Sequence, residues 1–178
     1  MSLILLLLLL LLFGLSFFGV GSVREEVSVA VVVASPPVGQ VATDGWTLVA
    51  GDDYTGVIVP EEEAADFVAA AGWDEAIEFW TPAPGDVAAL EEAFDAAWAE
   101  QPATADGRFA DPREHRRQYV GTVVDGRRLI EVNGFCDPHG ADWTSEPVVV
   151  LDGGAGFYRA TWDVEGGEYL ALTVNGEA

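Results

Sequence analysis

The pattern of polar and apolar residues first predicts two helices. In the longer one, apolar side chains recur at helical spacing after Asp86, a natural N-cap, at Val87, Leu90, Phe94 and Trp98. A shorter helix is expected from Pro60 to Gly72, because three glutamates near its start favour the positive end of the helix dipole and glycine is a common C-terminal cap. The apolar face of the longer helix must cover another apolar surface.

Short apolar runs between turn residues predict strands. The strongest signal is Asp125-Gly126, because a two-residue hairpin turn needs positive φ at both positions, and it joins expected strands at 118–124 and 127–133. Other strands are expected at 147–151, 157–163 and 168–174, with weaker signals at 56–59 and 76–80. These elements predict an α+β domain, with one or two helices packed on one face of an antiparallel sheet of four or more strands. The strand order stays open, since a sheet wrapped around the helix and a split arrangement fit the same list.

The N-terminus has a different pattern. Residues 3–23 carry no charge, and at about 1.5 Å per residue they match a hydrocarbon core about 30 Å thick. We therefore expect an N-terminal apolar helix that precedes the domain and serves as a signal peptide or transmembrane anchor at 1–23. The protein would then be membrane-anchored or secreted, and extracytoplasmic. Cleavage after Gly21 or Ala34 competes with a retained anchor, and a mispredicted start codon is the third reading. Two prolines make 24–40 a linker, which leaves 41–178 as a single domain.

Composition narrows the classes of function. Half of the residues are hydrophobic and six are tryptophan, which is enough for a core. The net charge of −22 repels phosphate backbones, so no nucleic-acid partner is expected. Residues 41–106 hold 16 acids and no base, whereas residues 107–135 hold six arginines, so we expect surface ion pairs between these segments rather than an anion site.

Within the arginine-rich segment, two cross-strand pairings are expected. Arg117 and Arg128 lie near opposite ends of the predicted hairpin, where Glu131 or Asp125 could be their neighbours. Pairs of this kind are worth about 0.2 to 1 kcal/mol.

Candidate chemistry concentrates around the single cysteine. Cys136, His139 and Asp142 supply soft and hard ligands at a spacing that could hold a metal in a loop, but a structural zinc site needs four ligands. We therefore predict no catalytic, cofactor-binding or metal residue, and keep these three as weak metal candidates. The alternative is a metal-dependent or cysteine-based enzyme, in which His139 or His115 would lower the thiol pKa while Asp137 opposes this.

The tryptophans allow two interpretations. Exposed, they would form a surface on which sugars stack. Trp98 falls on the predicted apolar helix face and Trp162 in a predicted strand, which favours a core instead. The run from Asp152 to Gly156 is rich in glycine like a phosphate-binding loop, but a strand follows it rather than a helix, so a turn is expected.

Four motifs in the C-terminal half carry a resemblance. They are R-x-Y-x-G from Arg117 to Gly121, G-R-R-x-I-x-x-N-x-F from Gly126 to Phe135, V-x-x-D-G-G-x-x-F from Val149 to Phe157, and L-x-x-N-G from Leu172 to Gly176. With the upstream piece FWTPAPGDVAALEEAF, the chain resembles an uncharacterised family of small exported bacterial proteins. The resemblance spans roughly residues 77 to 178, the bulk of the domain.

The resemblance implies a single domain and export, and it assigns no activity. The chain differs from the lipoprotein-like members because it has no lipobox cysteine. The function expected from leader, composition and resemblance together is a non-enzymatic binding or structural module of the cell envelope. Its partners would be a protein of the envelope and the membrane, the latter through residues 3–23, and no cofactor is expected.

Overall fold

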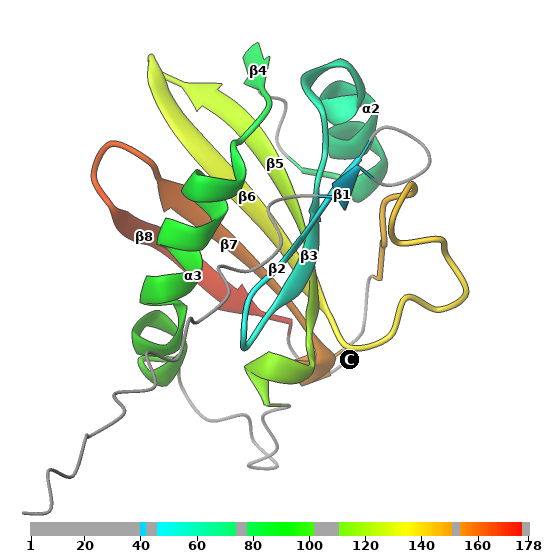
Figure 1. Cartoon of the computed structure of the whole chain (residues 1–178). Coiled ribbons are helices and arrows are strands. Elements are labelled where there is room, and N and C mark those ends of the chain that lie inside the picture. Colours follow the sequence, from blue (N-terminus) through cyan, green and yellow to red (C-terminus); the bar gives the residue numbers. More distant parts are fainter. Residues whose placement is uncertain (1–39, 42–45, 74–77, 102–110, 151–153, 176–178) are drawn as a thin grey trace, which may run out of the picture. The chain divides into compact units, whose positions relative to one another are not determined.

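The computed structural model describes residues 40–41, 46–73, 78–101, 111–150 and 154–175 (Figure 1). The expected leader at 1–23 and the linker, except for its last residue, lie outside the described residues. In the described part, no helix is long and apolar enough to cross a membrane. The described residues form two α-helices packed on one sheet, which confirms the α+β class.

Within the described residues, eight strands make up the sheet. They are β1 (Gln40–Val41), β2 (Thr47–Ala50), β3 (Thr55–Ile58), β4 (Glu78–Trp80), β5 (Arg116–Val124), β6 (Arg127–Phe135), β7 (Phe157–Asp163) and β8 (Glu168–Val174). The order is β1-β2-β3-β5-β6-β7-β8, and β4 pairs with the second half of β5. β3 and β5 are parallel, so the sheet is mixed rather than antiparallel throughout. The chain passes through both helices and β4 between these two strands, and this crossover lets it return in the same direction.

The two helices begin and end for local reasons. Helix α2 (Glu61–Ala71) ends at Gly72, which has a φ of 64° as expected for a glycine cap. Helix α3 (Pro84–Ala99) begins three residues before the expected start, with Ala83 at the N-cap position. Asp86 is therefore not the N-cap, and its carboxylate instead accepts a hydrogen bond from the Ala83 N–H at 2.9 Å, within the first turn of α3.

The helices cover opposite faces of the sheet, and not one face as expected. The buried side chains of α3 pack in a cluster with Ile58 and Tyr119, whereas those of α2 pack with Val57 and Val120. Neighbouring residues in a strand point to opposite faces, so these two clusters lie on opposite sides of β3 and β5. The continuous apolar run Val57 to Val59 is typical of a strand buried on both faces.

The hairpin prediction is confirmed and one predicted strand is not. β5 and β6 pair along their whole length through a turn in which Asp125 has a φ of 52° and Gly126 a φ of 77°. The predicted bounds of β7 and β8 also hold. Residues 147–150 form no strand, and the short strands β1 and β2 were not predicted.

Candidate functional site

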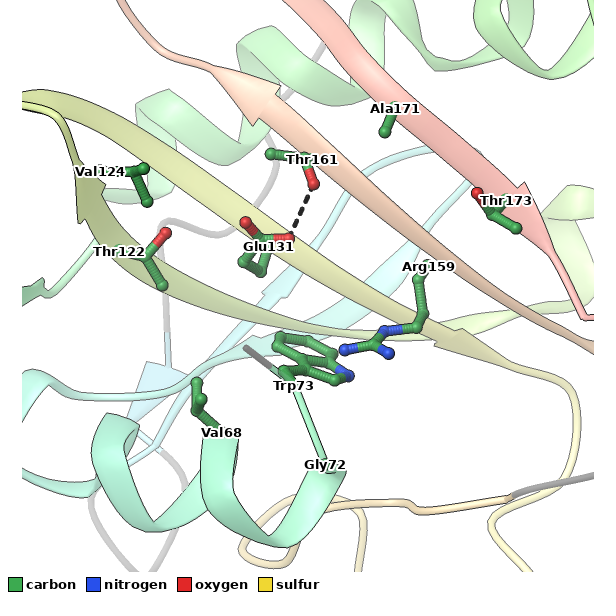
Figure 2. A pocket seen from close by; sticks show the side chains of 10 residues that line it. All are labelled: Val68, Gly72, Trp73, Thr122, Val124, Glu131, Arg159, Thr161, Ala171 and Thr173. Carbon is green, nitrogen blue, oxygen red and sulfur yellow. Dashed lines mark hydrogen bonds between the residues drawn. The ribbon is translucent and has the colours of Figure 1, made fainter. Parts of the chain in front are cut away.

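A groove of about 570 Å³ lies on the α2 face of the sheet, where the helix leaves β6, β7 and β8 uncovered (Figure 2). Its wall comes from Val68 in α2 and from Trp73 just after it. Its floor carries polar side chains from four adjacent strands, namely Thr122, Glu131, Arg159, Thr161 and Thr173. This volume is in the range of small-molecule sites, which is about 300 to 1,000 Å³.

Glu131 is the one carboxylate among the described residues that line the groove. Its Oε2 accepts a hydrogen bond from the hydroxyl of Thr161 on β7 at 2.8 Å, drawn as the dashed line in Figure 2. No other hydrogen bond from a described residue reaches this carboxylate. Burial raises the pKa of Glu131, while the Thr161 hydrogen bond and the charge of Arg159 offset only part of that rise.

Trp73 is brought over the sheet by the end of α2. Gly72 takes the left-handed conformation there, and the N–H of Trp73 donates to the carbonyl of Val68 at 3.1 Å. The indole packs edge-on against Phe67 with ring centroids 5.4 Å apart. The guanidinium of Arg159 lies over the same indole, 4.5 Å from the ring centroid. The groove thus has an aromatic wall that is fixed by the core and already accepts a cation.

A buried amide clamp stabilises the loop beside the groove. The amide of Gln118 donates to the carbonyl oxygens of Trp143 and Glu146, and its oxygen accepts from the N–H of Val148. Asn133 donates both to the Gln118 oxygen and to the carbonyl of Val148. The backbone around Val148 therefore obtains its hydrogen bonds from side chains rather than from a neighbouring strand. This explains why the strand expected at 147–151 is not seen at 147–150.

The opposite face of the sheet holds a buried ion pair. The Nε of Arg117 lies 3.1 Å from a carboxylate oxygen of Glu91 on α3, and both side chains are at most 5% exposed. Arg117 also donates to the phenol oxygen of Tyr158, and the phenol of Tyr119 donates to Glu91. Burial raises the pKa of Glu91, and the charge of Arg117 acts against that rise. This network joins α3 to the sheet and has no contact with the groove floor.

The expected arginine pairings are wrong for a reason of strand geometry. Arg117 pairs in register with Gly134 and points to the α3 face, whereas Glu131 lines the groove on the α2 face. Arg128 pairs with Glu165 at 2.8 Å, in the turn after β7. The arginine-rich segment does contact an acidic helix, as expected, but that contact is a buried pair rather than a surface pair.

The loop after β6 does not gather the weak metal candidates. Among the described residues, no three His, Cys, Asp or Glu side chains are grouped so that they could hold a metal ion. Asp142 accepts a hydrogen bond from the Thr144 hydroxyl at 2.6 Å, and the ring of His139 stacks on Phe157. Burial, with a contribution from Glu114, raises the pKa of the Cys136 thiol. A raised thiol pKa is the opposite of what a cysteine nucleophile needs.

The groove was not predicted from the sequence, although part of its signal is visible there. Trp46 and Trp162 are buried, as the core interpretation of the tryptophans requires, but Trp73 is only half-buried and lines the groove. In β6, the polar residues Glu131 and Asn133 alternate with apolar ones, which reads as a solvent-facing strand surface. Only the position of α2 turns that surface into the floor of a cavity.

Comparisons of the chain with models of protein families, with curated proteins and with solved structures give no match. The resemblance to small exported proteins therefore stays a prediction, and the case for a function rests on the geometry of the groove.

Proposed function

We propose that this protein is a non-enzymatic binding module that holds a small polar molecule in the groove between α2 and strands β5 to β8. The observation that carries the proposal is Glu131, a half-buried carboxylate on the floor of a groove that the fold leaves open. A carboxylate oxygen that no described residue hydrogen-bonds, placed on the floor of a groove, is suited to contact a bound polar molecule.

The composition of the lining supports binding rather than catalysis. The described lining residues offer hydroxyl groups, one carboxylate, one guanidinium and an indole, together with apolar side chains. They include no cysteine, histidine, serine, lysine or tyrosine. Hydrolytic mechanisms pair a nucleophile or a water molecule with a separate acid or base, and Glu131 has no second carboxylate beside it among these residues. The arrangement is suited to recognition by hydrogen bonds and stacking.

The expected location extends this proposal. The apolar segment at 3–23 favours a module that is exported or tethered to the membrane. The ligand would then be a molecule met outside the cytoplasm, and an envelope protein remains a proposed partner for the rest of the surface.

The experiment is a screen of a small-molecule library by NMR on the full-length protein, with the indole N–H of Trp73 as reporter. The matched variants are Ala171→Phe and Leu170→Phe, both on exposed positions of β8, of which only Ala171 lines the groove. We expect some library members to shift the Trp73 signal in the wild type and in Leu170→Phe but not in Ala171→Phe. If no compound shifts this signal, or if Ala171→Phe leaves the shifts intact, the groove is not a binding site.

A further inference from the structure

We propose that the ligand of the groove is an organic cation, an ammonium or guanidinium group attached to an apolar body; this inference rests on the proposed function. The charged end would pair with Glu131 on the floor, and the apolar body would lie along the wall of Val68 and Trp73.

The carboxylate of Glu131 has hydrogen-bonding capacity that no described residue uses. Of its two carboxylate oxygens, Oε2 receives the neutral hydroxyl of Thr161, and no described residue donates a hydrogen bond to Oε1. No ion pair within 4 Å joins this carboxylate to a described residue. Arg159, two residues before Thr161 on the same face of β7, places its guanidinium over the indole of Trp73. A ligand cation would supply the charge-assisted hydrogen bond that Oε1 lacks.

The lining of the groove also has an apolar part. Val68, Trp73, Val124 and Ala171 line the same groove as the polar floor. The contact between Arg159 and Trp73 shows that a cation is accommodated at an aromatic surface here, at 4.5 Å from the ring centroid. A molecule with a cationic end and an apolar body matches both parts of the lining.

The charges of the protein favour a cation over an anion or a neutral molecule. The net charge of −22 attracts cations towards the protein and repels anions at long range. An anion in the groove would face the carboxylate on the floor, and the guanidinium of Arg159, which lines the same groove, is stacked on the indole of Trp73. A neutral molecule would displace water from Glu131 without bringing a countercharge, and a carboxylate that loses water without one is disfavoured.

The test uses three probes of the same shape and different charge, namely 4-phenylbutylammonium, 4-phenylbutanol and 4-phenylbutanoate. Each is titrated into the full-length protein at pH 7.5, and the Trp73 indole N–H is followed by NMR. We expect the ammonium probe to bind about tenfold more tightly than the alcohol, which is the effect of one charge-assisted hydrogen bond, and the carboxylate probe to bind most weakly. Ala171→Phe should abolish the shifts of all three.

Two variants test the role of the carboxylate. Glu131→Gln keeps the shape of the side chain and should remove the preference for the ammonium probe. Glu168→Gln removes one negative charge from an exposed position of β8 and should preserve the preference, which separates pairing at Glu131 from general attraction to an acidic protein. If Glu131→Gln does not fold, the three-probe comparison on the wild type and on Ala171→Phe decides by itself.

The outcomes separate this inference from the proposed function. If the alcohol or the carboxylate probe binds as tightly as the ammonium probe and Ala171→Phe blocks it, the groove binds ligands and the cation assignment is overturned. An ammonium preference that survives Glu131→Gln also overturns it. If none of the probes shifts the Trp73 signal up to about 10 mM, a concentration at which even weak fragments bind, the cation assignment fails, whereas the proposed function fails only if the library screen also finds no compound that binds.

Discussion

Replacing threonine by valine should change the free energy of unfolding in opposite directions at two positions of the groove floor. Thr122 on β5 is 3% exposed, and its hydroxyl is buried without any hydrogen-bond partner among the described residues. The hydroxyl of Thr161 on β7 donates to the carboxylate of Glu131 at 2.8 Å. Valine has nearly the shape of threonine and replaces the hydroxyl by a methyl group. Thr122→Val therefore removes an unsatisfied buried group, whereas Thr161→Val removes a hydrogen bond to a charge.

The hydrogen bonds set the size of each effect. Burying a hydroxyl without a partner costs about 1 to 3 kcal/mol, so we expect Thr122→Val to raise the free energy of unfolding by about 1 to 2 kcal/mol. A hydrogen bond to a charged group contributes about 1.5 to 3 kcal/mol, and Thr161→Val leaves Glu131 with no donor among the described residues. We expect Thr161→Val to lower the free energy of unfolding by about 2 kcal/mol. The two variants should thus differ by about 3 to 4 kcal/mol.

Urea unfolding of the two variants and the wild type at pH 7.5 measures this difference, and unchanged m values show that the unfolded states are comparable. Thr173→Val is the matched control, since Thr173 is exposed at the edge of the same groove, and its effect should lie within about 0.5 kcal/mol. Thr122→Ser keeps the hydroxyl and should lose about 1 kcal/mol with the buried methyl group. The reasoning is refuted if Thr122→Val destabilises the protein, because the hydroxyl would then have a partner in solution.

Four further predictions concern the rest of the domain. Arg117→Met should lower the free energy of unfolding by about 3 to 5 kcal/mol, because it leaves the buried carboxylate of Glu91 without its cation. The control Arg113→Met removes one partner of an exposed pair and should give no resolvable change. Equal effects of the two variants in urea unfolding would contradict this prediction. Gln118→Leu should speed amide hydrogen exchange at 143–148, where the amide clamp holds the backbone, and unchanged exchange there would show that the clamp is dispensable. Because the pKa of Glu131 is raised in the folded state, the wild type should lose stability as the pH rises from the ordinary glutamate pKa through the raised one. Glu131→Gln cannot ionise, so its urea midpoint should increase relative to that of the wild type over this pH range. Parallel pH profiles of the two urea midpoints would contradict this prediction. Alkylation of Cys136 by iodoacetamide should have a pH midpoint above the ordinary range of a thiol, and rapid reaction at pH 7 would contradict the raised pKa.

Local signals in the sequence were enough to predict most individual helices and strands. The turn at Asp125-Gly126 and the end of α2 at Gly72 both need positive φ, and the residue types that tolerate it stand at those positions. The bounds of β7 and β8 follow from turn residues on either side. Such signals depend on a few neighbouring residues, so they can be read without knowing the rest of the fold.

Errors arose where distant segments decide the outcome. Nothing near β3 in the sequence shows that its partner is β5 or that the two run parallel. The apolar segment at 147–150 has the composition of a strand, but its backbone is held by the side chains of Gln118 and Asn133. Hydrogen bonds from remote side chains leave no periodic pattern in the segment that receives them.

The sequence by itself determined the α+β class, the main hairpin, both helices and the charge of the surface, because propensity, turn chemistry and net charge are properties of short segments or of simple sums. Only the tertiary structure decided which polar residues share a site. The register of β6 and β7 places Glu131 opposite Thr161. The end of α2 places Trp73 in the same groove. Register and helix placement follow from packing across the whole sheet, and a shift of one residue would move Glu131 to the other face.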